Sequence, residues 1–135
     1  MIDHEGLAAW LRLTLIPGIG GETQRKLLAA FGLPEAIFAA GRLAARAVAG
    51  ERADLLFDFD PSEEVDRNLA WAAQPAQRII TLADADYPRA LLEIADPPSV
   101  LYVRGNAGLL HKHGLAVVGS RNATPQGIQT AENFA

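Results

Sequence analysis

Apolar side chains in the first half of the chain recur with the period of short helices. Leu7, Trp10, Leu11 and Leu15 fall on one face of a helix that Asp3 is placed to cap. The proline and glycine at positions 17 and 18 end that helix. Further helices are predicted at 23–31, 34–40, 42–49 and 60–73, whereas 50–59 has no clear pattern.

Glycine and proline set the limits of these helices. Gly32 is placed to end the second helix in a left-handed conformation. Pro34 occupies a natural first-turn position for the third, which Gly41 ends. Asp60-Pro61-Ser62-Glu63 combines a capping carboxylate, a first-turn proline and an acid near the positive helix end, which indicates a firm helix start.

The second half of the chain changes to strand patterns. Strands are predicted at 78–82, 100–103 and 115–118, with turns at Tyr87-Pro88 and Asp96-Pro97-Pro98. The third is apolar on both faces, which is typical of a strand buried inside a parallel sheet. A last helix is predicted to begin near Pro125 or Gln126.

These patterns predict an α/β chain with a helical domain at 1–75 and an α/β part at 76–135. A parallel sheet covered by helices on both faces needs roughly 100 residues or more. The sequence from 78 to 135 supplies 58. We therefore interpret the chain as the front part of a larger protein, cut in mid-domain; a small complete α+β protein is the alternative.

Composition excludes several classes of protein. The chain has no cysteine, so a disulfide scaffold and a thiolate site are excluded. Its histidines, His4, His111 and His113, lack the spacing of a helical metal-ligand pair. Its apolar runs are short and its first residues are acidic, unlike a membrane span or a signal peptide. We expect a soluble, cytoplasmic protein with no membrane association, no metal and no cofactor.

The net charge of −4 is unevenly distributed. Residues 1–52 carry 6 basic and 5 acidic side chains, and 99–135 carry 3 basic and 1 acidic. Residues 53–98 carry 3 basic and 10 acidic. The two ends are therefore mildly basic, and an anionic partner is compatible with them.

The first candidate site is Leu15-Ile16-Pro17-Gly18-Ile19-Gly20, which has the pattern of a helix–hairpin–helix turn. Gly18 and Gly20 permit a tight turn, and the amides there can face a phosphate without reading base sequence. Arg25 and Lys26 would attract phosphate, whereas Glu22 would repel it. The alternative is a turn that only packs two helices or contacts a protein.

The second candidate site follows the third predicted strand, at Gly119-Ser120-Arg121 and Thr124. Ligands of open α/β sheets bind beyond the carboxyl ends of strands, at such turns. Arg121 offers a planar cationic fork suited to phosphate, the two hydroxyl groups can hydrogen-bond, and the next helix adds a positive end. The dinucleotide fingerprint and the Walker ending are both absent. An ordinary tight turn with an exposed arginine is the alternative.

From Tyr87 onward the chain resembles the DNA-processing protein A (DprA/Smf) family. The residues that carry the resemblance are Tyr87-Pro88, Leu91, Ile94, Asp96-Pro97-Pro98, Leu101-Tyr102, Gly105, Leu109-Leu110, Val117-Val118-Gly119-Ser120-Arg121, Thr124 and Gly127. The preceding Ile16-Pro17-Gly18-Ile19-Gly20, Phe31-Gly32 and Pro34-Glu35-Ala36 resemble the family's N-terminal helical module. Leu33 stands where a small capping residue is commoner.

The resemblance implies a small all-α, SAM-like (helix-hairpin-helix) domain followed by the beginning of an extended Rossmann-like domain. It implies a non-catalytic mediator of natural transformation that binds single-stranded DNA and loads the RecA recombinase onto it. The family's phosphate pocket maps onto Gly119, Ser120, Arg121 and Thr124. Self-association, as a homodimer of the full-length protein, and any C-terminal winged-helix module would involve residues beyond 135.

Two other functions remain open at this point. The same turn could hold a nucleotide in a nucleotide-cleaving hydrolase on a related Rossmann-like scaffold. Alternatively, the first 75 residues could be a protein-docking module that contacts no nucleic acid.

Overall fold

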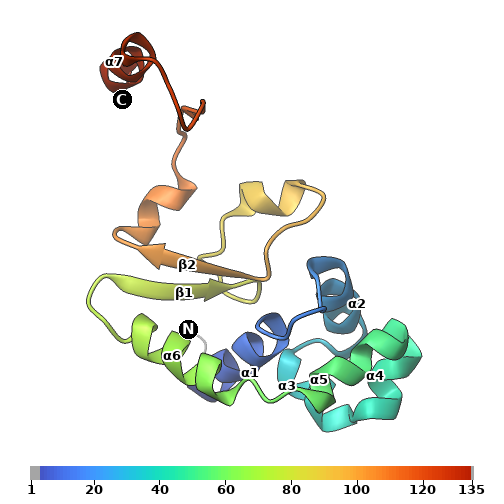
Figure 1. Ribbon diagram of the computed structural model, residues 1–135. Helices are drawn as coiled ribbons and strands as arrows, with labels where there is room; N and C mark the ends of the chain where they lie inside the picture. Colours follow the sequence, from blue (N-terminus) through green and yellow to red (C-terminus); the bar gives the residue numbers. More distant parts are fainter. Residues whose placement is uncertain (1–3, 135) are drawn as a thin grey trace.

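The computed structural model describes residues 4–134 and consists of a helical half followed by a small sheet and a last helix (Figure 1). The element bounds are α1 His4–Thr14, α2 Gly21–Phe31, α3 Pro34–Ala40, α4 Arg42–Ala49, the 3-10 turn η1 Gly50–Asp54, α5 Leu55–Asp58, α6 Ser62–Ala72, β1 Gln77–Thr81, η2 Arg89–Glu93, β2 Val100–Arg104, η3 Ala107–His111 and α7 Pro125–Phe134.

The predicted helices of the first half are confirmed. Gly32 ends α2 at φ +93°, and its N–H donates to the Leu28 carbonyl at 2.8 Å. Pro34 occupies the first turn of α3, and Leu33 precedes it without a side-chain cap. The Ser62 N–H donates to Asp60 at 3.1 Å, so this aspartate stabilises the start of α6 as expected. The predicted cap Asp3 lies outside the described residues.

The segment without a sequence pattern, 50–59, forms the short turn η1 and the single-turn helix α5. Its buried residues Ala53 and Leu56 join the main helical core. That core consists of eight residues that are fully or almost fully buried: Leu13, Ile16, Ile19, Leu27, Ile37, Ala45, Ala53 and Leu56. The core therefore lies between α1, α2, α3, α4 and α5, and burial of its side chains is the main force that holds these short helices together.

A second core joins the helices to the sheet. Leu11 of α1, Val65 of α6 and Ile79 of β1 form its buried centre. Helices α1 and α6 thus cover one face of the sheet, and the connection that contains η2 lies on the other side (Figure 1). Ile80, fully buried, alternates with Ile79 and faces the side of that connection.

The sheet differs from the parallel sheet that the sequence suggests. Strands β1 and β2 pair antiparallel, with Ile79 opposite Tyr102 and Ile80 opposite Leu101. The connection between the strands, residues 82–99, contains no helix that could cross a face of the sheet; its regular element is the five-residue turn η2, whereas a parallel return usually contains a helix. Prediction of the two strands was right, and the parallel direction suggested for the sheet was wrong.

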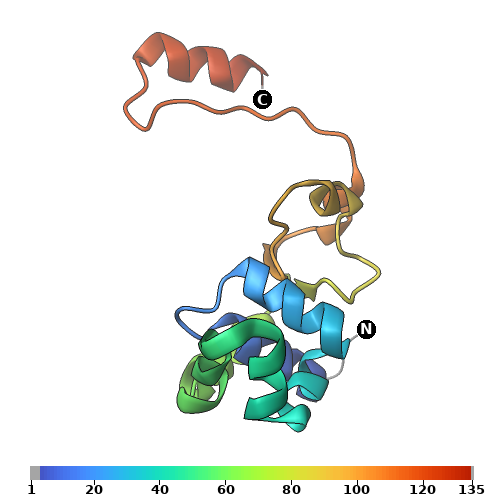
Figure 2. The ribbon, with the colours of Figure 1, turned by 90° about the vertical axis from the view of Figure 1, so that its right-hand side faces the viewer.

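The predicted third strand at 115–118 is wrong for this structure. These residues have no strand assignment, and Leu115 and Val118 are 76% and 90% exposed. A strand is stable only when its backbone groups pair with a neighbour, and within residues 4–134 the sheet has two strands, β1 and β2. The segment is therefore extended and leads to α7, which stands away from the helical half (Figure 2).

Across residues 4–134, no helix combines the length and the apolar character that a membrane crossing requires. The same residues contain no group of three His, Cys, Asp or Glu side chains arranged to hold a metal ion.

Candidate nucleic-acid interface

The turn at 119–124 lies between the extended segment and α7, and its side chains are exposed. The Ser120 hydroxyl accepts a hydrogen bond from the Asn122 N–H at 3.1 Å. The Thr124 hydroxyl accepts from the Gly127 N–H at 3.1 Å and so caps the first turn of α7. Both hydroxyl oxygens therefore have a local role in shaping the turn.

Arg121 is the cation of this turn. It is exposed, and among residues 4–134 no carboxylate lies within ion-pair distance of its guanidinium. Each of the acids paired in the structure is bound by another cation. A guanidinium without an internal partner, next to a helix N-terminus, leaves its hydrogen-bond donors available to an external anion.

Gly119 does not have a positive φ. Positive φ among the glycines is confined, within the described part of the chain, to Gly18, Gly32, Gly41, Gly50 and Gly105. A Cβ on Gly119 would meet nothing within 4 Å. The conformation of the turn therefore does not require glycine at this position, and the space beside its main chain is open.

The two glycines singled out in the hairpin between α1 and α2 differ in backbone conformation and in their surroundings. Gly18 has φ +90°, and a Cβ there would lie 2.7 Å from the Leu55 side chain, so this position requires glycine. Its carbonyl accepts a hydrogen bond from Arg52 at 3.3 Å. Gly20 precedes α2 in an extended conformation with open space around it. The hairpin and the 119–124 turn lie in separate parts of the molecule (Figures 1 and 2).

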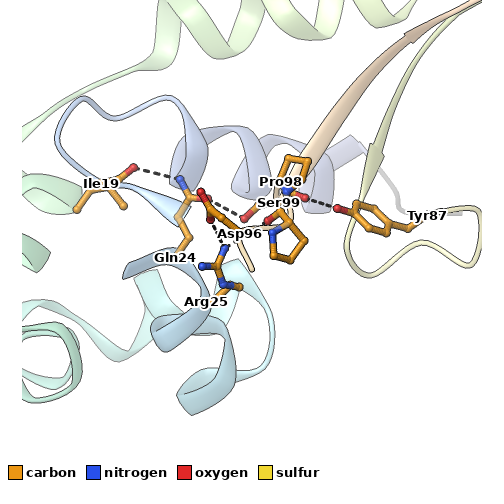
Figure 3. A network of polar contacts seen from close by, with 8 residues as sticks. Ile19, Gln24, Arg25, Tyr87, Asp96, Pro98 and Ser99 are labelled. Atoms are coloured by element: carbon orange, nitrogen blue, oxygen red, sulfur yellow. Dashed lines mark hydrogen bonds and ion pairs between the residues drawn. The ribbon is translucent and has the colours of Figure 1, made fainter. Parts of the chain in front are cut away.

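A polar network fixes the segment before β2 onto this hairpin (Figure 3). The guanidinium of Arg25 contacts the Asp96 carboxylate at 2.5 Å and donates to the Pro97 carbonyl at 3.3 Å. Asp96 also lies against Gly21, where a Cβ would overlap its carboxylate. Glycine at position 21 therefore makes room for the carboxylate beside the start of α2.

The buried half of the network is formed by Gln24 and Ser99. The Ser99 hydroxyl donates to Gln24 Oε1 at 2.7 Å, and Gln24 Nε2 donates to the Ile19 carbonyl at 3.1 Å (Figure 3). Nearby, the Tyr87 hydroxyl donates to the Pro98 carbonyl at 2.7 Å, and burial raises the pKa of that tyrosine. The amide of Gln24 thus connects the hairpin to residues 75 positions away in sequence.

Sequence reasoning placed Arg25 and Lys26 as attractors of phosphate, and the structure pairs both with acids. Arg25 binds Asp96, and Lys26 lies 3.6 Å from Glu22 on the same helix. Gln24, Asp96 and Ser99 were not singled out as site residues. The sequence feature that could have indicated Asp96 and Ser99 is the Asp-Pro-Pro-Ser run at 96–99, which places a carboxylate and a hydroxyl on either side of a rigid turn.

Comparison with known proteins gives one family match and one curated relative for this chain. Residues 78–135 match the family described as DNA recombination-mediator protein A. Protein Smf of Escherichia coli (strain K12) is 31% identical over 121 residues, which cover 90% of this chain and 31% of that protein. The chain thus spans about a third of the length of this curated relative, and no solved structure matches it. Residues 78–135 therefore belong to the DNA recombination-mediator protein A (DprA/Smf) family, and the chain is homologous to Smf over 90% of its length.

Proposed function

We propose that this chain is the N-terminal portion of a non-catalytic mediator that holds single-stranded DNA and delivers the RecA recombinase to it during natural transformation. The observation that carries the proposal is the exposed turn at 119–124, whose Arg121 has no partner among the described residues. This turn lies inside the segment that matches the recombination-mediator family. Delivery of RecA rests on the family alone.

The chemistry of the turn suits a sugar–phosphate backbone. Arg121 supplies a fixed positive charge and a planar fork that can bind two phosphate oxygens. Gly119 leaves open space beside the main chain, and the N-terminus of the ten-residue helix α7 adds a partial positive charge. Ser120 and Thr124 hold the turn through their hydroxyl groups. Contacts of this kind bind DNA without selecting its sequence.

For the organisation of the chain we propose a SAM-like helical domain at 1–75 and the beginning of a Rossmann-like domain at 76–135. The helices α1–α6 support the first part, and the start of the family match at residue 78 supports the second. Buried residues from both parts, Leu11, Val65 and Ile79, share one core. The two parts therefore fold against each other along α1 and α6.

The hairpin glycines Gly18 and Gly20 are the second proposed DNA contact, and the structure sets a condition on it. A phosphate at the start of α2 would have to displace the Asp96 carboxylate, which lies against Gly21 and is bound by Arg25. The side chain of Asp96 is 74% exposed, and exposed ion pairs contribute little stability. DNA contact at the hairpin therefore requires opening of the Arg25–Asp96 pair, whereas contact at Arg121 requires no such change.

The test is Arg121→Ala in the full-length protein, measured by fluorescence anisotropy with a labelled single-stranded oligonucleotide. Loss of a charged hydrogen bond of about 1.5–3 kcal/mol weakens binding roughly 10- to 150-fold. Binding of the unaltered protein also weakens as salt rises, because phosphate contacts release counterions.

Arg89→Ala is the matched control, because Arg89 is an exposed arginine in the turn η2, away from α7. We expect its binding to stay close to that of the unaltered protein. Equal affinity of the two variants, or equal salt dependence of the Arg121 variant and the unaltered protein, would remove Arg121 from the DNA site.

A further inference from the structure

A groove on the helical half has a composition opposite to that of a DNA site. Residues of α1, α3, α5 and α6 and of the segment between α5 and α6 line a hollow of about 650 Å³, which we name the acidic groove. Its wall contains three phenylalanines, Phe38, Phe57 and Phe59, and Phe59 is 48% exposed. Exposed aromatic surface inside a hollow is a common feature of protein-contact sites.

Among the described residues that line the groove, four are carboxylates and one, Arg12, is a cation. Asp58 is bound by Arg42 at 2.6 Å, and this hydrogen bond lowers the pKa of Asp58. Asp60 accepts hydrogen bonds from Ser62, which lower its pKa in the same way. Both acids therefore stay ionised at neutral pH.

The other two carboxylates, Glu35 and Asp66, are available to a ligand. Within residues 4–134, neither makes an ion pair or a hydrogen bond with another side chain. The groove thus carries net negative charge with two acids unpaired. It repels phosphate and attracts a cationic partner.

Two arginines of the chain already make cation–π contacts with phenylalanines of the groove wall. The guanidinium of Arg12 lies 3.9 Å from the centre of the Phe38 ring. Arg42 lies 5.8 Å from the Phe57 ring and also binds Asp58. An aromatic face combined with a carboxylate is a favourable site for a guanidinium, through cation–π attraction and a charged hydrogen bond. Phe59, Glu35 and Asp66 present the same combination to an incoming group.

We propose that the acidic groove is a docking site for a basic segment of a partner protein, in which an arginine stands next to a large apolar side chain. The arginine binds Glu35 or Asp66, and the apolar side chain covers Phe59. The charge of the groove excludes nucleic acid as its occupant, so this site is separate from the turn at Arg121. The proposal does not depend on DNA binding, and its test contains no DNA.

The test is an NMR titration of the ¹⁵N-labelled chain with a synthetic peptide, acetyl-Arg-Lys-Phe-Leu-Arg-Lys-amide. We expect amide shifts to concentrate in α1, α3 and α6, and affinity to fall with added salt. The double substitution Glu35→Gln with Asp66→Asn should weaken binding roughly fivefold, the size expected when two partly exposed ion pairs are lost.

The matched control is Glu63→Gln with Glu93→Gln, which removes two exposed carboxylates that do not line the groove. This control should bind like the unaltered chain, and a peptide with acids in place of its basic residues should not bind. Absence of shifts, shifts outside the groove, or equal affinity of the two double variants would overturn the proposal. The proposal would also be overturned if the unaltered chain and the Glu63/Glu93 control formed a dimer and the Glu35/Asp66 variant did not. That result would mean that the groove binds a second copy of this chain.

Discussion

The bond between Ser99 and Gln24 gives the sharpest test of how the hairpin is joined to the sheet. The substitution Ser99→Ala removes the hydroxyl that donates to Gln24 Oε1 at 2.7 Å. Ser99 is 4% exposed and Gln24 is 7% exposed, so water has little access to the oxygen that loses its donor. The substitution should therefore leave a buried acceptor unsatisfied and destabilise the fold.

The expected size follows from this burial. A buried polar group left without its partner costs about 1–3 kcal/mol. The neighbouring ion pair contributes less, because the Asp96 side chain is 74% exposed and pairs of this kind contribute about 0.2–1 kcal/mol. We therefore expect Ser99→Ala to lower the free energy of unfolding more than Asp96→Ala does.

Urea unfolding of the chain, followed by tryptophan fluorescence, measures both changes. The midpoint should fall for Ser99→Ala while the dependence on denaturant stays the same, because the surface exposed on unfolding is unchanged. Ser120→Ala is the control, since this serine is exposed and bonds only within its own turn. Its free energy of unfolding should stay within about 0.5 kcal/mol of the unaltered chain.

Two results would refute the reasoning. One is a Ser99 variant no less stable than the Ser120 variant, which would mean that water or another donor satisfies Gln24. The other is a larger loss for Asp96→Ala than for Ser99→Ala, which would place the stabilising interaction at the exposed end of the network. High salt should reduce the effect of the Asp96 substitution and leave that of Ser99 unchanged.

Three further predictions concern the fold. Gly18→Ala should destabilise the chain by about 1–2 kcal/mol or more because of its positive φ and the close leucine side chain, whereas thermal unfolding of Gly20→Ala should stay near that of the unaltered chain. Ile80→Ala, at a fully buried position, should cost about 2–5 kcal/mol in urea unfolding, and a loss below 1 kcal/mol would show that the sheet core is loosely packed. The Arg42 hydrogen bond lowers the pKa of Asp58, so its contribution to stability is present above the ordinary value of 3.8 and is lost as pH falls through the lower folded value. Asp58→Asn should remove that part of the acid dependence of the unfolding midpoint, and an unchanged profile would contradict the assignment.

Much of the helical half could be predicted from the sequence. Helix starts and ends follow from local chemistry, such as the cap of Asp60 and the positive φ of Gly32, and local chemistry acts within a few residues. The segment 50–59 could not be predicted, because its turn and single-turn helix are held by burial of Ala53 and Leu56 in a core built by other helices.

The candidate site was partly predictable. The sequence identified an arginine at a turn before a helix, and the structure leaves that arginine exposed and without a partner among the described residues. It did not identify the Asp96–Arg25 and Ser99–Gln24 contacts, because these join segments about seventy positions apart. The error at 115–118 has the same origin, since an apolar pattern indicates that a strand can form but not whether a partner strand is beside it.

The sequence by itself determined the helices, the two strands, the glycine at position 18 and the resemblance to the recombination-mediator family. Each depends on residue type, on spacing over a few positions, or on a pattern shared with related chains. Tertiary structure alone decided the antiparallel pairing of β1 and β2, the burial of Gln24 and the placement of Asp96 against Gly21. These features depend on which distant segments meet, and they follow from the packing of α1, α2 and α6 against the sheet and its connection.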